Sequence, residues 1–119
     1  MSAIIGASSE LQCANKLVEM GWDIAFPYTH NSAVDFVIYK FDQLRTIQVK
    51  GTEFTESGKF NRITIDGNKY SHIDYVILHD RVYRSWYIFS KGEIEGKRTT
   101  MVLNPNKLHE QHNNWKKIR

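Results

Sequence analysis

The sequence predicts an α/β fold in which a mixed β-sheet is flanked by helices. Three observations support this class: apolar residues at three- and four-residue spacing near the N-terminus, short β-type runs through the middle of the chain, and a helix-start signal near its end. The 119 residues contain no repeat or linker and match the size of one compact domain, so residues 1–119 are expected to form a single domain.

A helix is expected from residue 3 to residue 20. Its apolar residues form one stripe, which is expected to face the core: Ile4, Ala7, Leu11, Ala14 and Val18. Gly21 follows as the residue type that commonly ends helices. At about 100° per residue, Glu10 lies about 80° from the centre of that stripe, so its carboxylate is expected at the flank of the helix, beside the core.

Short β-type runs follow this helix. Residues 22–26 form the first run, which Pro27 ends, and residues 28–33 are typical of a loop. Residues 34–41 and 44–50 are expected to form two antiparallel strands joined by a tight turn. The apolar side chains expected on the core face of this strand pair are Phe36, Ile38, Ile47 and Val49.

The alternation of apolar residues determines the register of this pair. If Phe36 pairs with Ile47, then Asp35 lies directly opposite Gln48. Lys50 comes two residues later and therefore lies on the same face as Gln48. The apolar pattern thus gathers three polar side chains on one patch of the sheet.

The remainder of the chain alternates turns with β-type runs. Residues 51–59 are typical of a polar loop. The runs after it lie at 60–65, 73–78, 86–89 and 99–103, and the first of these is either a strand or an irregular connection. Asn104 followed by Pro105 is a helix-start signal. It predicts a C-terminal helix with one shared face formed by Leu108, His112 and Trp115.

Composition excludes several classes of protein. A single cysteine, Cys13, rules out an intramolecular disulfide and any zinc site that needs two or more cysteines. No apolar run approaches the roughly 20 residues that cross a bilayer, and no secretory signal is present, so a cytoplasmic protein without a membrane partner is expected. A formal charge of +3 suits a polyanionic partner without requiring one.

The patch around Asp35 has the groups that phosphodiester hydrolysis needs. An aspartate and a side-chain carbonyl, here Asp35 and Gln48, can hold Mg²⁺ or Mn²⁺ through hard oxygen ligands. The Lys50 ammonium can orient the attacking water and offset phosphate charge, and Glu10 can complete the metal's surroundings. The alternative is a cross-strand ion pair of Asp35 and Lys50 without catalytic function.

Asp35, the run Gln48-Val49-Lys50 and the upstream Glu10 resemble the PD-(D/E)XK nuclease superfamily. The resemblance covers residues 5–52 and is closest to small homing-type endonucleases with a Gln-X-Lys motif. It implies a restriction-endonuclease-like core, a divalent metal, and cleavage of duplex or branched DNA.

The resemblance also implies roles for the four residues. Asp35 would be the main metal ligand, Gln48 a neutral second ligand, Lys50 the catalytic lysine and Glu10 the outer carboxylate. The sequence departs from the pattern twice. Val34 replaces the proline of the family's name, and Gln48 removes one negative charge from the metal site.

Binding to DNA needs cations outside the catalytic patch. The residues expected to contact backbone phosphates are Lys59, Arg62 and Lys69. Because one small domain offers little surface for reading a long site, a homo-oligomer, dimer or tetramer, is expected. The leading role is a homing-type endonuclease, and the alternatives are a Holliday-junction resolvase and a non-catalytic DNA-binding module with a relic site.

Overall fold

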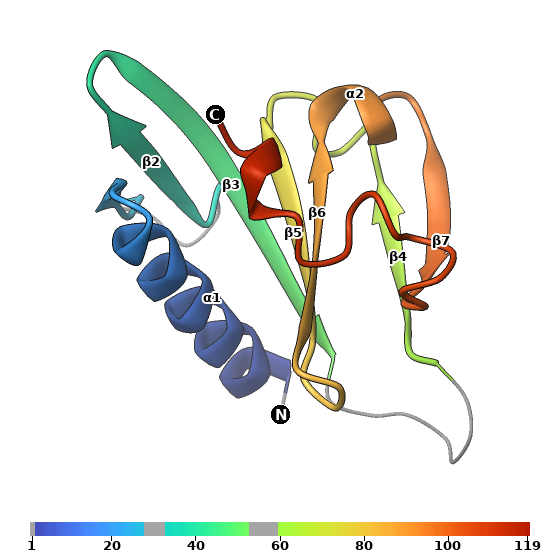
Figure 1. The fold of residues 1–119 in the computed structure, drawn as a ribbon. Helices are drawn as coiled ribbons and strands as arrows, with labels where there is room; N and C mark the ends of the chain where they lie inside the picture. The colour runs from blue at the N-terminus through green and yellow to red at the C-terminus, as the bar shows by residue number, and fades with distance from the viewer. Residues whose placement is uncertain (1, 28–32, 53–59) are drawn as a thin grey trace.

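A computed structural model describes residues 2–27, 33–52 and 60–119 of the chain (Figure 1). The helix α1 (Ser2–Glu19) packs on one face of a five-stranded sheet of order β1-β2-β3-β5-β6. The strands of this main sheet are β1 (Asp23–Ala25), β2 (Phe36–Lys40), β3 (Gln43–Thr52), β5 (Tyr75–Asp80) and β6 (Ser85–Ser90). None of the described helices is both long and apolar enough to cross a membrane.

The central strand β3 makes the sheet mixed. It pairs antiparallel with β2 through residues 43–47 and parallel with β5 through residues 47–52. The remaining pairs, β1 with β2 and β5 with β6, are antiparallel. From Gln48 onward, β3 therefore no longer pairs with β2. The two strands separate at this point, where β2 begins. The prediction of an α/β fold built on a mixed sheet is confirmed.

The register predicted for the β2–β3 pair is confirmed. Phe36 pairs with Ile47, and the four apolar side chains expected on the core face are all buried: Phe36, Ile38, Ile47 and Val49. Here the period-two pattern of the sequence was sufficient, because one face of the pair is covered by α1 and a shift of one residue would expose every apolar side chain.

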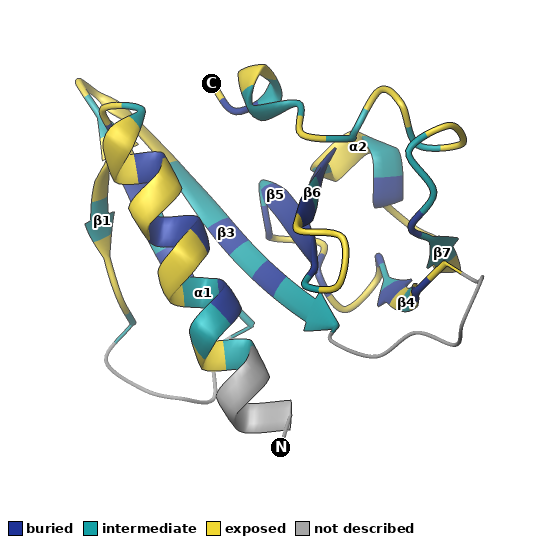
Figure 2. Ribbon diagram, turned by 60° about the horizontal axis from the view of Figure 1, so that its bottom comes forward, coloured by how far each residue is buried: buried dark blue, intermediate teal, exposed yellow. Residues whose placement is uncertain are grey.

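The face of α1 that meets the sheet is not the one predicted from the apolar stripe. Leu11 and Val18 are 63% and 52% exposed, whereas the buried residues of the helix are Ser9, Cys13, Ala14 and Leu17. Figure 2 shows these buried bands alternating with exposed ones along α1. At about 100° per residue Glu10 lies only about 35° from the centre of the buried face, not about 80° from it. Glu10 therefore points along the core-facing side of the helix, one turn before Cys13.

A second layer covers the other face of the main sheet. The strands β4 (Arg62–Asp66) and β7 (Arg98–Val102) form a separate two-stranded antiparallel ribbon. Figures 1 and 2 place it on the side of the main sheet opposite α1. Apolar residues of the ribbon and of the strands beneath it form one buried cluster, which includes Ile65, Val76, Leu78, Tyr87 and Leu103. The run at 60–65 is thus a strand, but one that lies outside the main sheet.

The predicted C-terminal helix is wrong. After Asn104 the chain forms turns and ends in the short 3₁₀ turn η1 (Trp115–Lys117). Asn104 and Pro105 do begin a turn, in which the Asn104 side chain accepts the Asn106 N–H at 2.9 Å. No helix continues from it, so Leu108, His112 and Trp115 share no helical face.

The C-terminal tail forms no helix because it pairs with the edge of the main sheet. β6 is an end strand, and the tail pairs with it: the Ile88 N–H donates to the Gln111 carbonyl at 3.0 Å and the Asn113 N–H to the Trp86 carbonyl at 2.6 Å. An end strand with a row of free backbone groups is stabilised by such a cover. The backbone groups of residues 111–113 are used there and not in a helix.

Candidate active site

Asp35 is held at the point where β2 and β3 separate. Its N–H donates to the Ile47 carbonyl at 2.8 Å, and one of its carboxylate oxygens, Oδ2, accepts the Val49 N–H at 2.6 Å. The side chain thus takes the place of the next backbone partner on β3. An N–H donated to a carboxylate is a strong, directional hydrogen bond, so the position of this carboxylate is well defined.

The carboxyl of Glu10 meets that of Asp35. The pKa of Asp35 is raised from 3.8 to about 7, and burial is the largest cause. The hydrogen bond from the Val49 N–H lowers this pKa, the side-chain hydrogen bond and the charge of Glu10 raise it, and the charge of Lys50 lowers it. Two carboxyl groups that interact in this way form an arrangement that a bound cation would stabilise.

Gln48 lies on β3, one residue beyond the pair of Phe36 and Ile47, which is the last pair of the β2–β3 register. Asp35 itself donates its N–H to the Ile47 carbonyl, so the placement of Gln48 opposite Asp35 stays a prediction. The Gln48 side chain is half-buried, and Nε2 donates a long hydrogen bond of 3.4 Å to the Val49 carbonyl. The amide nitrogen makes this bond, so the amide oxygen is the atom of Gln48 that could bind a metal.

Lys50 is positioned by an aromatic ring that sequence analysis did not single out. Its Nζ lies 5.3 Å from the ring centroid of Tyr70, which is buried in the turn after β4. A cation over an aromatic face is attracted by the ring's quadrupole. No local pattern in the sequence indicates this contact, because it joins residues 20 positions apart on different layers.

The three residues expected to contact phosphates have different outcomes. Lys59 lies outside the described residues. Arg62 is exposed at the start of β4. Lys69 is exposed as well, and its Nζ lies 5.8 Å from the centroid of the same Tyr70 ring that Lys50 contacts, so the structure brings Lys69 near the active site.

The donors at the site fit a hard divalent cation. Within residues 2–27, 33–52 and 60–119, no three His, Cys, Asp or Glu side chains are grouped so that they could hold a metal ion. The available ligands are two carboxylates, Glu10 and Asp35, and the amide oxygen of Gln48. Mg²⁺ and Mn²⁺ prefer oxygen ligands, and Mg²⁺ keeps several waters, so this incomplete set is sufficient for Mg²⁺ whereas a structural zinc ion needs four protein ligands.

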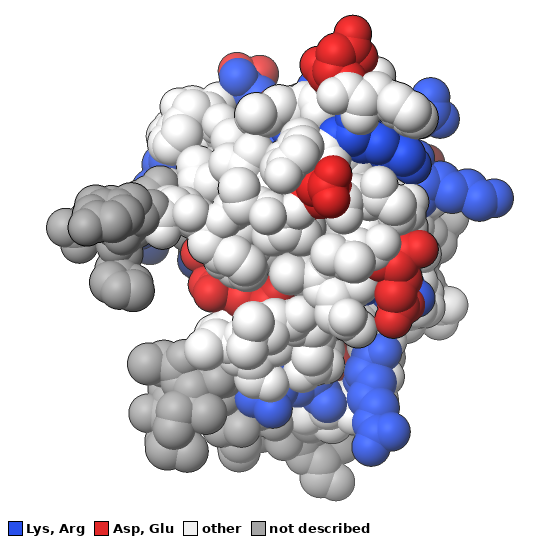
Figure 3. All heavy atoms as spheres, turned by 90° about the vertical axis from the view of Figure 1, so that its left-hand side faces the viewer, with Lys and Arg blue, Asp and Glu red and all other residues white. Residues whose placement is uncertain are grey.

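A simple ion pair of Asp35 and Lys50 does not account for this arrangement. Such a pair would have no use for Glu10, whose carboxyl places a second acid against the first. Seen from the side of α1 and β2, acidic side chains lie recessed in a hollow of the surface (Figure 3). A recessed acidic patch is the feature expected of a metal site rather than of a solvated surface pair.

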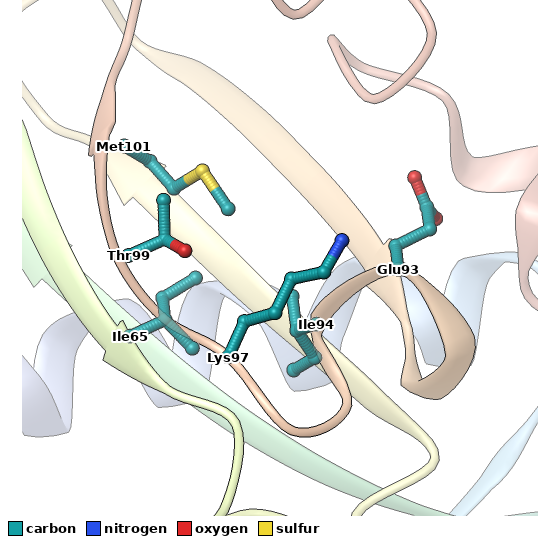
Figure 4. A pocket seen from close by; sticks show the side chains of 6 residues that line it. All are labelled: Ile65, Glu93, Ile94, Lys97, Thr99 and Met101. Carbon is teal, nitrogen blue, oxygen red and sulfur yellow. The ribbon is translucent and has the colours of Figure 1, made fainter.

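A separate pocket lies under the ribbon. It has a volume of about 140 Å³ and is lined by Ile65, Glu93, Ile94, Lys97, Thr99 and Met101 (Figure 4). None of the four candidate catalytic residues lines it. The lining contains one acid and one base among mostly apolar side chains, which does not match the chemistry of phosphodiester hydrolysis.

Comparisons with known proteins support the family and the fold. A family model described as PD-(D/E)XK endonuclease matches residues 2–117. Protein 5.3 of Escherichia phage T7 is 29% identical over 109 residues, which cover 87% of this chain and 92% of that protein. The solved structure of the bacterial homing endonuclease I-Ssp6803I superposes with a TM-score of 0.73 at 17% identity, covering 98% of this chain and 92% of that one. At this level of identity the superposition establishes a shared fold.

Proposed function

This chain belongs to the PD-(D/E)XK endonuclease family, and we propose that it is a divalent-metal-dependent nuclease that hydrolyses phosphodiester bonds of DNA. The observation that carries the proposal is the position of Asp35 at the opening between β2 and β3, where its carboxylate accepts the Val49 N–H and is acted on by Glu10 and by the charge of Lys50. Gln48, two residues before Lys50 on β3, is proposed as a further oxygen ligand.

The four residues divide the chemistry between them. Glu10, Asp35 and the Gln48 amide oxygen would hold Mg²⁺ or Mn²⁺, and the ion would supply Lewis-acid polarisation of the phosphate and an acidified water. The Val49 N–H fixes Asp35 and so orients its free oxygen. The Lys50 ammonium, held over the Tyr70 ring, orients the attacking water and offsets the charge that builds up on the phosphate.

We propose a homing-type endonuclease acting as a homo-oligomer as the biological form. The support is the shared fold with a solved bacterial homing endonuclease and the small size of one domain relative to a long DNA site. Sedimentation of the purified protein measures its mass in solution. A strictly monomeric protein that cuts DNA would contradict the oligomer.

The experiment that tests the function compares substrates and metals in one panel. Supercoiled plasmid, linear duplex and a four-way junction are incubated with Mg²⁺, Mn²⁺ or EDTA. We expect metal-dependent cleavage of plasmid and linear duplex by the parent. Preferential cleavage of the four-way junction would contradict the homing role and indicate a resolvase. Binding of DNA without cleavage in either metal would contradict the nuclease activity and indicate a DNA-binding module.

Two variants accompany the panel. Lys50→Ala is expected to bind DNA with nearly unchanged affinity and to lose cleavage, because a single charge adds little to binding. Lys16→Ala removes an exposed cation from α1 and is the matched control. Equal cleavage by the parent and Lys50→Ala would remove this lysine from the mechanism.

A further inference from the structure

The β4–β7 ribbon presents two different faces. Its inner face packs on the buried cluster that includes Val76, Leu78 and Tyr87, with Ile63, Ile65 and Met101 turned toward the main sheet. Strand alternation then turns every second residue outward. Four of these outward side chains are exposed to solvent, and all four are cationic or hydroxyl-bearing: Arg62, Thr64, Arg98 and Thr100.

The outer face repeats itself about a local two-fold axis. β4 begins Arg62-Ile63-Thr64 and β7 begins Arg98-Thr99-Thr100, so both strands read Arg-X-Thr. Thr64 pairs with Thr100 in the antiparallel register, and their hydroxyl oxygens lie 2.9 Å apart. An axis through this pair relates the two arginines. They stand at opposite ends of the ribbon, four residues or about 14 Å apart along the strands.

We propose that this outer face of the β4–β7 ribbon enters the major groove of duplex DNA. The inference rests on the proposed DNA endonuclease function and names the surface that holds the substrate. A two-stranded ribbon fits the major groove, which is about 12 Å wide, and the spacing of Arg62 and Arg98 matches the two phosphate backbones that border it. Thr64 and Thr100, between them, reach base edges, where a threonine hydroxyl or methyl group can contact a base.

Charge on the outer face favours an anion. Asp66 is the one acid among the six outward positions of the described ribbon, and it lies directly opposite Arg98. Its Oδ1 accepts the Asn68 N–H at 3.1 Å, so part of its charge is used in the turn. Arg62 and Arg98 outnumber Asp66 among these outward positions, so the face has a net positive charge.

The ribbon is fixed relative to the active site at both ends of β4. Before the strand, the buried Asn61 donates through Nδ2 to Asp80 Oδ1 at 3.0 Å, at the end of β5. After the strand, Tyr70 packs under the Lys50 ammonium. DNA held on the ribbon is therefore held at a constant distance from the catalytic lysine, which is what cleavage at a defined position requires.

The test measures binding and cleavage separately on the full chain. Binding of a mixed-sequence DNA duplex of several helical turns is followed by anisotropy in Ca²⁺ across a range of salt concentrations. Arg62→Ala with Arg98→Ala is expected to weaken binding about 10- to 100-fold and to reduce the slope of log affinity against log salt by about 2. Lys16→Ala and Lys91→Ala, two exposed cations on helices, form the matched double control.

Two further measurements address the groove and the threonines. Methyl green, which occupies the major groove, should displace the parent, whereas distamycin in the minor groove should not. Thr64→Val with Thr100→Val keeps shape and charge, so the salt slope should stay unchanged while enrichment of preferred duplexes from a randomised pool falls. Thermal melting confirms that each variant is folded.

The outcomes separate this inference from the proposed function. One outcome is a parent that binds and cuts DNA while the Arg62→Ala, Arg98→Ala variant binds as tightly as the lysine control. That result would overturn the ribbon as the DNA-binding surface and leave the proposed nuclease function standing. Displacement by distamycin alone, or equal binding of duplex RNA, whose major groove is too deep and narrow for a ribbon, would overturn the groove assignment. A parent that neither binds nor cuts DNA overturns both.

Discussion

Two carboxyl clusters of this protein place acids in opposite surroundings. Asp35 meets a second acid, Glu10, and its pKa is raised to about 7, mainly by burial. Glu93, at the start of α2 (Lys91–Ile94), is also partly buried, yet its pKa lies below the usual value. Burial opposes its ionisation there too, but hydrogen bonds from Lys117, Ser90 and Gln111 more than offset burial.

The hydrogen-bond donors around each carboxyl group explain why the two pKa values shift in opposite directions. Glu93 closes a capping box, accepting the Ser90 N–H at 3.0 Å and the Ser90 hydroxyl at 2.9 Å, and it also receives Gln111 and Lys117 from the tail. These donors satisfy the charge from within the chain, so the cluster stabilises the fold by tying the tail to α2. At Asp35 the side-chain hydrogen-bond partner is another acid, and the charge of Lys50 does not outweigh burial and Glu10, so the pKa of Asp35 stays raised. Only the arrangement at Asp35 suits a metal site.

The largest expected effect separates the two clusters by metal binding. Asp35→Asn should abolish the calorimetric signal of Mn²⁺ binding and reduce cleavage by about 100- to 1,000-fold, because it removes the anionic ligand of the strand pair. Glu93→Gln is the matched control, since it neutralises the other acid and should leave metal binding unchanged. Equal Mn²⁺ binding by Asp35→Asn and the parent would place the metal elsewhere.

The next effect concerns the neutral ligand. Gln48→Ala deletes the amide oxygen and should lose most of the cleavage rate. Gln48→Glu adds a negative charge beside the two acids, so it should lower the metal concentration needed for half-maximal cleavage while it increases repulsion between the carboxylates. Metal titrations of cleavage for the parent and both variants measure this. A parent and Gln48→Ala that cut equally well would remove Gln48 from the site.

Glu93→Gln should reduce the free energy of unfolding by about 1–3 kcal/mol, because it weakens hydrogen bonds that several donors make to one carboxylate. Chemical denaturation measures this loss. The pH dependence has a definite sign. A lowered pKa in the folded state adds stability above the ordinary value of 4.5, and this contribution disappears as the pH falls through the lowered pKa. The variant should show a weaker loss of stability in acid than the parent.

The last effect, comparable in size to that at Glu93, is a pH-dependent stability change near His79, on the α1 side of the sheet. Its Nδ1 lies 2.8 Å from the Ser9 hydroxyl and its ring stacks on Trp86. Burial, followed by the charge of Arg81, lowers the pKa of His79 from 6.5 to about 4. Between these values the unfolded chain binds more protons than the folded one, so the free energy of unfolding should fall with falling pH, by up to about 3 kcal/mol.

Denaturation curves across this pH window provide the measurement. His79→Gln should flatten the dependence, whereas the exposed His72→Gln should keep it. A parent whose stability is constant from pH 6.5 to pH 4 would show that His79 does not titrate in this way.

The sequence by itself determined the strand pair and its register. Phe36, Ile38, Ile47 and Val49 alternate with polar residues, and only one register buries all four. Because alternation along a strand is a local rule, that register also puts Gln48 and Lys50 on the face of β3 opposite Ile47 and Val49. The placement of Asp35 directly opposite Gln48 stays a prediction. The mixed α/β class followed from the same local patterns.

Tertiary structure decided the rest, because those features depend on contacts between distant segments. Helix α1 carries two lines of apolar residues, and only packing on the sheet chose the line with Cys13 and Leu17, which turned Glu10 toward Asp35. The tail carried a helix-start signal, but the free edge of β6 took up its backbone groups. Tyr70 reached Lys50 from another layer. A periodicity reports which faces are apolar, and only the assembled core decides which of them are buried.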